Sequence, residues 1–219
     1  MPPRRRPRRR RTRSIIPALC LAALFLAAGL GVWFFHAHRG LPGESVTLPE
    51  YVEQDFLTVN PYSRPGTELK KIDGIVIHYV GNPGTTARAN RSYFESLSSG
   101  TDGVYASAHF IVGLDAEVLQ CIPLTEISYA SNSRNDDTIA IEVCHPDDTG
   151  KFSEVTYSRV VELTAWLCDQ LDLTADDVIR HYDVSGKDCP KYYVEHPEAW
   201  EQFRSDVSDA LAALKKTDE

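Results

Sequence analysis

The chain has 219 residues, enough for one domain with a sizeable core and an additional segment. With 42% hydrophobic and 25% charged residues, its composition is that of a globular protein rather than a disordered one. The net charge of −8 is uneven, because residues 1–14 hold 8 of the 23 basic residues and no acid, which leaves 15 basic against 31 acidic residues, or −16, for the remainder. An arginine-rich head on an acidic body indicates either nucleic-acid contact or a membrane-topology signal.

Residues 15–35 (IIPALCLAALFLAAGLGVWFF) distinguish these two possibilities. They form a run of 21 residues without a charge, and about 20 apolar residues suffice for a helix to cross a bilayer. The aromatic residues at the far end of the run favour the membrane interface, and the arginines fit the positive cytoplasmic flank. We therefore expect a single-pass anchor in the cell membrane, with the N-terminus cytoplasmic and the body outside, and no nucleic-acid partner.

A cleaved signal peptide is the alternative interpretation of this run. Its apolar part would measure roughly 7–15 residues, shorter than the run found here, and the following FHAHRG has no small-x-small cleavage site. A retained anchor is therefore the better interpretation.

The segment after the anchor is rich in proline, glycine and polar residues, which predicts a stalk that becomes ordered near Tyr51. The expected organisation is an Arg-rich cytoplasmic segment at 1–14, a transmembrane anchor at 15–35, a stalk at 36–54, a folded domain at 55–214 and a tail at 215–219.

Within the folded domain, patterns of period two and of helical period alternate. In chain order they predict a buried strand at 72–80, a helix at 85–97, a hairpin of strands at 108–114 and 118–122, a strand at 138–144, a helix at 156–171, a short strand at 178–181 and a last helix from Pro197. This order predicts an α/β domain with a central mixed sheet flanked by helices.

Three side chains of the metal-ligand type lie next to predicted strand ends: His78, His181 and Cys189. Two imidazoles and one thiolate can hold a tetrahedral Zn²⁺ and leave its fourth position to water, whose pKa the ion lowers towards about 7. Taken alone, His78 would more often be a buried structural histidine, and the spacing of His181 and Cys189 is equally weak evidence of a metal site.

Four segments together give a stronger signal: IVIHYVGNPGTTA, ASAHFIVG, IAIEVCH and IRHYDVSGKDCP. In this order they resemble the N-acetylmuramoyl-L-alanine amidases of the amidase-2 family, which is related to phage lysozyme-amidases and peptidoglycan recognition proteins. The resemblance covers roughly residues 55–210. It implies that residues 55–214 are an amidase catalytic domain that hydrolyses the bond between N-acetylmuramic acid and L-alanine in peptidoglycan, with Zn²⁺ bound by His78, His181 and Cys189.

The resemblance also implies two catalytic residues. Glu142 matches the family's glutamate, and its carboxylate can take a proton from the attacking water and return it to the leaving amine. Lys187 matches the family's lysine, whose ammonium can stabilise the oxyanion that forms at the carbonyl. Some relatives carry a tyrosine just before the ASAHF histidine; Ala108 stands there in this chain, which shifts the work to Glu142.

The remaining histidines and cysteines have weaker patterns. We expect His109 to be structural or to orient a ligand or Glu142, and His145 to be structural. Cys121, Cys144 and Cys168 fall on predicted core positions, where they are either free thiols or partners in a disulfide. A cysteine hydrolase that pairs Cys144 with His145 or His109 is a remote alternative.

Two further functions compete with hydrolysis of the cell wall. A domain of this type with an incomplete zinc set would bind peptidoglycan without cutting it, but the Cys189 position is filled and Glu142 and Lys187 are present. A zinc peptidase acting on proteins would be favoured by an H-E-x-x-H helix, which the sequence lacks. The sequence makes no prediction of oligomeric state.

Overall fold

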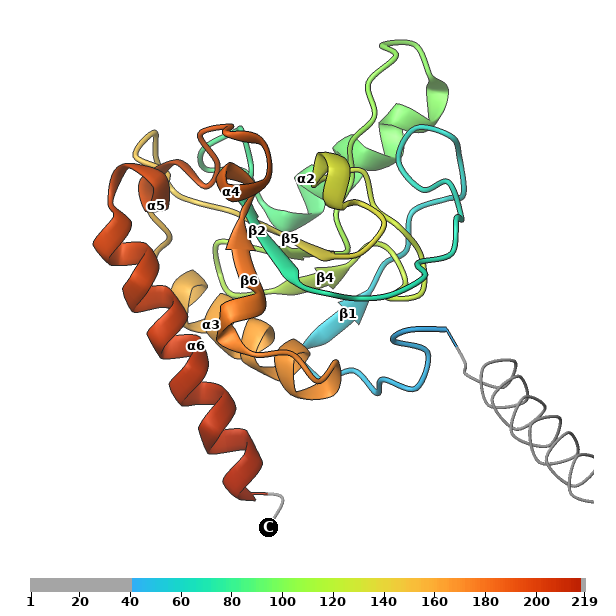
Figure 1. Cartoon of the computed structure of the whole chain (residues 1–219). Coiled ribbons are helices and arrows are strands. Elements are labelled where there is room, and N and C mark those ends of the chain that lie inside the picture. Colours follow the sequence, from blue (N-terminus) through green and yellow to red (C-terminus); the bar gives the residue numbers. More distant parts are fainter. Residues whose placement is uncertain (1–40, 218–219) are drawn as a thin grey trace, which may run out of the picture. The chain divides into compact units, whose positions relative to one another are not determined.

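The computed structural model describes residues 41–217 (Figure 1). The Arg-rich segment at 1–14 and the expected membrane anchor at 15–35 lie outside the described residues, as do residues 218–219 of the expected tail. Among residues 41–217, none of the helices combines the length and the apolar character needed to cross a bilayer.

The described residues contain a six-stranded mixed sheet, which confirms the predicted α/β architecture. Only β3 and β4 run antiparallel to each other, as the hairpin pattern predicted, and the other neighbours are parallel. The order across the sheet is β1 (Val52–Gln54), β4 (Val118–Gln120), β3 (Phe110–Val112), β5 (Ile139–Val143), β2 (Ile75–Tyr79) and β6 (Val178–Arg180).

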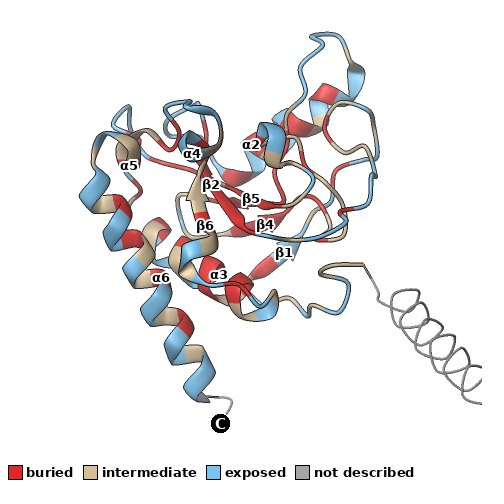
Figure 2. Cartoon of the chain, in the orientation of Figure 1, coloured by how far each residue is buried: buried red, intermediate tan, exposed pale blue. Residues whose placement is uncertain are grey.

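Helices cover both faces of the sheet, and the strands between them are buried (Figure 2). On one face, α3 (Glu154–Gln170) and α6 (Pro197–Thr217) pack against the apolar side chains of β2 and β5. On the other face, α2 (Ala87–Ser96) packs in a second, smaller core. Central strands buried on both faces are β-branched and continuously apolar, which is why IVI and IAI were recognisable in the sequence.

Side-chain caps set where two of the three predicted helices begin. Thr86 Oγ1 accepts a hydrogen bond from the backbone N–H of Ala89 at 3.2 Å, so α2 begins at Ala87, two residues later than predicted. Ser153 Oγ accepts from Thr156 N–H at 3.3 Å, so α3 begins at Glu154, two residues earlier than predicted.

The short helices were not predicted, because one or two turns carry no measurable hydrophobic period. They are η1 (Leu97–Ser99), η2 (Asn132–Arg134), η3 (Ala175–Asp177), α4 (His181–Ser185) and α5 (Lys191–Glu195). The predicted strand at 178–181 is therefore one residue too long. The Asp183 carboxylate accepts the Arg180 N–H at 2.9 Å, which ends β6 at Arg180 and makes His181 the first residue of α4.

The described part of the expected stalk packs on the domain. Val46, Leu48 and Tyr51 contact the core under α3 and α6, and β1 pairs in parallel with β4. A strand of three residues is too short to show an alternating pattern, so β1 was not predicted.

Candidate functional site

The site lies at the carboxyl ends of the central parallel strands. His78 on β2 and Glu142 on β5 are direct partners in the sheet register. Side chains that are paired across parallel strands point to the same face, which here is the face covered by α2. His78 is 2% exposed, so its imidazole is enclosed beneath the surface at this edge of the sheet.

The other two predicted ligands come from the loop that follows β6. His181 begins α4, and Gly186 ends that helix in the left-handed conformation with φ of 74°. The chain then turns back, so that Tyr182 N–H donates to the carbonyl oxygen of Cys189 at 2.9 Å. This return places Cys189 Sγ 3.9 Å from His78 Nδ1.

The ligand atoms of His78, His181 and Cys189 all lie within 4.8 Å of one another, and all three residues are buried. The two imidazole rings are 4.6 Å apart between centroids. His181 Nδ1 is enclosed and has no hydrogen-bond partner among the described residues, although buried ring nitrogens are normally satisfied. An orphaned nitrogen beside a second imidazole and a thiol fits the donor set of a borderline-soft divalent cation.

Burial sets the protonation of these three residues without an ion. It lowers the pKa of His78 well below its usual value, with the charges of His181 and Lys187 adding to the effect. Burial, and then Lys187, also lowers the pKa of His181. Burial raises the pKa of the Cys189 thiol to about 12. Both imidazoles are therefore neutral and able to donate a lone pair, and the thiol gives up its proton when a cation binds.

Glu142 lies beside this cluster with one carboxylate oxygen, Oε2, enclosed and without a hydrogen-bond partner in the described structure. Burial raises the pKa of Glu142 to about 8, and the positive charge of Lys187 opposes that rise. A carboxyl group with this pKa exchanges a proton near neutral pH, as a general acid or base must.

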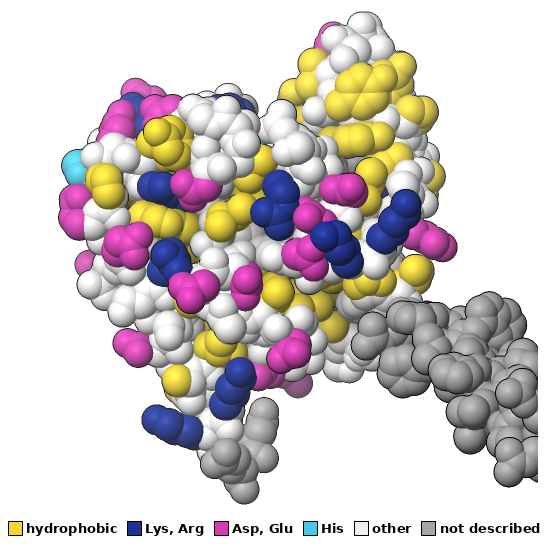
Figure 3. All heavy atoms as spheres, in the orientation of Figure 1, with side chains coloured by type: hydrophobic (Ala, Val, Ile, Leu, Met, Phe, Trp, Pro, Cys, Tyr) yellow, Lys and Arg dark blue, Asp and Glu magenta, His cyan; other side chains and the backbone are white. Residues whose placement is uncertain are grey.

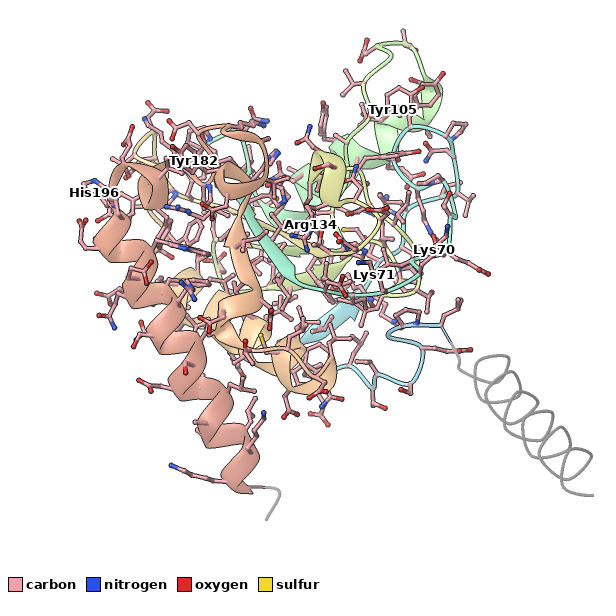
Figure 4. All side chains as sticks on the ribbon, in the orientation of Figure 1. Lys70, Lys71, Tyr105, Arg134, Tyr182 and His196 are labelled. Atoms are coloured by element: carbon pink, nitrogen blue, oxygen red, sulfur yellow. The ribbon has the colours of Figure 1, made fainter. Side chains whose placement is uncertain are left out.

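All five predicted site residues line one groove of about 650 Å³. Its two sides are α4 with the following loop and the lobe that α2 and residues 97–107 form; Tyr182 on α4 and Tyr105 on the lobe mark them in Figure 4. The lobe carries a cluster of exposed hydrophobic side chains (Figure 3), among them Tyr93, Val104 and Tyr105. The groove is thus polar at its floor and aromatic along one wall.

The model of the amidase-2 family, described as N-acetylmuramoyl-L-alanine amidase, matches residues 68–192, more than half of the chain. The chain belongs to the amidase-2 family. The matched range contains His78, Glu142, His181, Lys187 and Cys189, the residues that the groove brings together.

Individual relatives agree with this membership. The chain is 34% identical over 172 residues to a probable N-acetylmuramoyl-L-alanine amidase of Bacillus licheniformis, covering 73% of this chain and 48% of that protein. It is 32% identical over 178 residues to the N-acetylmuramoyl-L-alanine amidase BlyA of Bacillus subtilis strain 168, covering 72% and 47%. The chain spans about half the length of the curated relatives it matches.

Among solved structures, the catalytic domain of XlyA superimposes with a TM-score of 0.60 at 27% identity. The match covers 71% of this chain and 98% of that one. The similarity therefore extends over nearly the whole XlyA catalytic domain rather than over the sheet alone.

His109 and His145 are structural in this amidase-2 domain. His109 Nδ1 accepts the Ala140 N–H at 3.0 Å, and Nε2 donates to the Glu126 carbonyl at 2.9 Å, with its pKa lowered to about 4 by burial. Both bonds go to the backbone, so the structural role is confirmed and the expected orienting of Glu142 is not seen. His145, also buried, contacts two backbone carbonyls at 2.7 and 2.8 Å.

The predicted core cysteines Cys121, Cys144 and Cys168 are buried free thiols. Cys144 accepts a weak hydrogen bond from Asn90 Nδ2 at 3.6 Å and packs in the smaller core. Burial raises its pKa to about 12, which is the opposite of what an activated nucleophile requires. The structure therefore gives no support to the cysteine-hydrolase alternative.

Four residues of the site were not predicted: Tyr105, Tyr129 and Asn132 line the groove, and Ser131 is buried next to it. Ser131 and Asn132 contact the outer ring nitrogens of His78 and His181 at 3.1 and 2.6 Å. Tyr105 and Tyr129 form an edge-to-face pair on the groove wall, with ring centroids 5.6 Å apart. Tyr105, Tyr129 and Ser131 lie in irregular segments and Asn132 begins the single turn η2, so no period marks any of the four. The one available signal was the run SNSRND, whose small polar residues predict a tight turn.

Proposed function

We propose that this chain hydrolyses the amide bond between N-acetylmuramic acid and L-alanine in bacterial peptidoglycan, with Zn²⁺ held by His78, His181 and Cys189. One observation carries the proposal: the buried nitrogen, nitrogen and sulfur ligand set lies in the same groove as Glu142 and Lys187. Membership of the amidase-2 family and the names of the relatives support the choice of bond.

When bound, Zn²⁺ supplies Lewis acidity, polarising the scissile carbonyl and making water more acidic. Glu142 takes one proton from the attacking water, whose oxygen forms a bond to the lactyl carbonyl carbon. The carbon–nitrogen bond then breaks, and Glu142 returns the proton to the alanine nitrogen, leaving a free amine and a lactyl carboxylic acid, which ionises to the carboxylate by releasing its proton to solvent. One carboxyl group performs both transfers because it first accepts the proton of the attacking water and then donates the same proton to the leaving amine.

Lys187 stabilises the negative charge that develops on the carbonyl oxygen. Its ammonium lies at the groove and is close enough to lower the pKa of His78, His181 and Glu142. Because this cation is already in place before the reaction, the site does not have to reorganise when the negative charge develops.

A non-catalytic peptidoglycan-binding module is the alternative. Such a module needs the groove but no proton-transfer group, and here Glu142 has a raised pKa and an unpartnered oxygen beside the ligand cluster. These two features favour hydrolysis.

The purified chain, incubated with isolated peptidoglycan, tests the proposal. We expect loss of turbidity and release of new alanine N-termini, both abolished by a zinc chelator and restored by Zn²⁺. Glu142→Gln should lower the rate by about 10²–10⁴-fold, and Glu195→Gln, an exposed position in α5, should leave it unchanged. Binding of the polymer by a zinc-loaded protein without any cleavage would favour the recognition module instead.

We also propose that residues 15–35 tether the domain to the outer side of the cell membrane. The uncharged run of 21 residues and its arginine flank support this placement. Removing residues 1–40 should release the protein from membranes and preserve its activity on isolated wall. A shortened protein that still sediments with membranes would show that the anchor lies elsewhere.

A further inference from the structure

Two neighbouring residues of a single turn contact the Nε2 atoms of His78 and His181, the two histidines of the proposed zinc site. We propose that Ser131 and Asn132 position the imidazoles of His78 and His181, each by accepting a hydrogen bond from Nε2–H and so directing the Nδ1 lone pair at the metal ion. This inference rests on the proposed zinc site. Neither residue lies in the four segments that carry the family resemblance.

The contact with Asn132 determines which nitrogen of the His181 ring carries the proton. A neutral imidazole has one N–H donor and one acceptor nitrogen. Asn132 Oδ1 lies 2.6 Å from His181 Nε2 and can only accept, so Nε2 carries the proton and Nδ1 has the lone pair. Nδ1 of His181 is also the nitrogen that has no hydrogen-bond partner among the described residues.

His78 follows the same pattern. Its Nε2 lies 3.1 Å from Ser131 Oγ, and its Nδ1 faces Cys189 Sγ at 3.9 Å. Ser131 and His78 are 1% and 2% exposed, and a hydrogen bond screened from water holds the ring plane firmly. With Ser131 Oγ as the acceptor of the His78 Nε2–H, Nδ1 is the ring nitrogen of both histidines that is left to bind an ion.

The turn is built to hold these two acceptors in place. Asn135 Oδ1 accepts the backbone N–H groups of Ala130 at 3.1 Å and of Ser131 at 2.6 Å. Thr138 Oγ1, next to β5, donates to the carbonyl of Arg134 at 2.6 Å. The turn is thus fixed both internally and to the end of the sheet.

Asn132 has a left-handed backbone, with φ of 52°. Non-glycine residues adopt this conformation at a cost, and it is enriched where a side chain has to be aimed. Asparagine tolerates it better than most residues. In this conformation the Asn132 side-chain oxygen contacts His181 Nε2 at 2.6 Å.

The test is zinc affinity, measured on the full-length protein by competition with a chromophoric chelator. Asn132→Gly removes the amide and still permits the left-handed backbone, and Asn132→Asp keeps an acceptor oxygen. Ser131→Ala removes the other acceptor. Ser133→Ala, exposed in the same turn, is the matched control.

We expect Asn132→Gly and Ser131→Ala each to bind Zn²⁺ about 10–100-fold more weakly. Asn132→Asp should restore affinity close to that of the native protein, and Ser133→Ala should not change it. The visible spectrum of bound Co²⁺ should change in the two weakened variants, because the ligand geometry changes, while thermal unfolding of the metal-free variants stays near that of the native protein.

Native zinc affinity and an unchanged Co²⁺ spectrum in Asn132→Gly would overturn the inference. So would equal weakening in Asn132→Gly and Asn132→Asp, because the lost property would not be the acceptor. If the native protein itself bound no zinc, the proposed function would fail together with this inference, an outcome distinct from failure of the positioning role alone.

Discussion

At the scale of single residues, burial favours the neutral forms of the titratable groups at the site. Glu142, His78, His181 and Cys189 all have pKa values shifted towards their neutral forms, and burial is the largest cause in each case. Two of these groups also have a buried polar atom without a partner among the described residues, Nδ1 of His181 and Oε2 of Glu142. A divalent cation bound there would favour the ionised forms of the carboxyl and thiol groups.

The raised pKa of Glu142 predicts how the stability of the metal-free protein depends on pH. The folded pKa of about 8 exceeds the unfolded value of 4.5, so the folded state binds more protons between these values and loses stability as pH rises through them. Glu142→Gln removes this loss, which is on the order of 3 kcal/mol. Urea unfolding with chelator at about pH 5.5 and about pH 8.5 measures the effect.

His78, His181 and Cys189 also make the free energy of unfolding depend on pH, and they do so in both proteins. The effect of Glu142 is therefore the difference in the free energy of unfolding between the native protein and Glu142→Gln. That difference should favour the variant increasingly as pH rises. A difference independent of pH would mean that Glu142 is already ionised in the folded metal-free protein.

At the scale of elements, the loop after β6 determines whether the ligands meet. His181 begins α4, Gly186 ends it with φ of 74°, and Cys189 returns to the His78 ring. An added Cβ at Gly186 would meet no atom within 4 Å, so substitution there tests the backbone conformation alone.

Gly186→Ala should therefore lower the free energy of unfolding by about 1–2 kcal/mol, the cost of a left-handed alanine. Gly81→Ala is the matched control, since a Cβ there is equally free of contacts and its φ lies outside the left-handed region. Chemical denaturation of both variants measures the difference. Equal effects at the two glycines would contradict the assigned role of the Gly186 conformation.

Periodic elements were predictable from the sequence, and irregular ones were not. The IVI and IAI runs of β2 and β5, the β3–β4 hairpin and the long helices α3 and α6 carry clear periods. The turn at Ser131 and Asn132 has no period, and its function depends on one left-handed residue and on side-chain contacts to His78 and His181. Contacts between residues about fifty positions apart leave no local pattern.

The same division applies to the site residues. His78, Glu142, His181, Lys187 and Cys189 were identified from motif resemblance, and the fold brings all five to one groove. The fold places His78 and Glu142 side by side because β2 and β5 pair in parallel and in register. That pairing could not be read from two strands more than sixty residues apart in the chain.

At the scale of the whole molecule, the groove joins a ligand cluster to an aromatic wall. The floor holds His78, His181 and Cys189, and the wall carries Tyr105 and Tyr129. An open groove of about 650 Å³ suits a section of a polymer rather than a small enclosed ligand. A tether at residues 15–35 would confine such an activity to the wall next to the membrane.

The central claim is that this groove cleaves one particular amide bond, and identification of the cleaved atoms tests it most directly. Purified peptidoglycan is digested in water labelled with oxygen-18, with and without a zinc chelator, and the products are examined by mass spectrometry. Hydrolysis at the muramoyl–alanine bond places the label on the lactyl carboxylate of the glycan and frees an unlabelled peptide with an alanine N-terminus, only when zinc is available. Label on a peptide carboxylate, or the same products in the presence of chelator, would contradict the account.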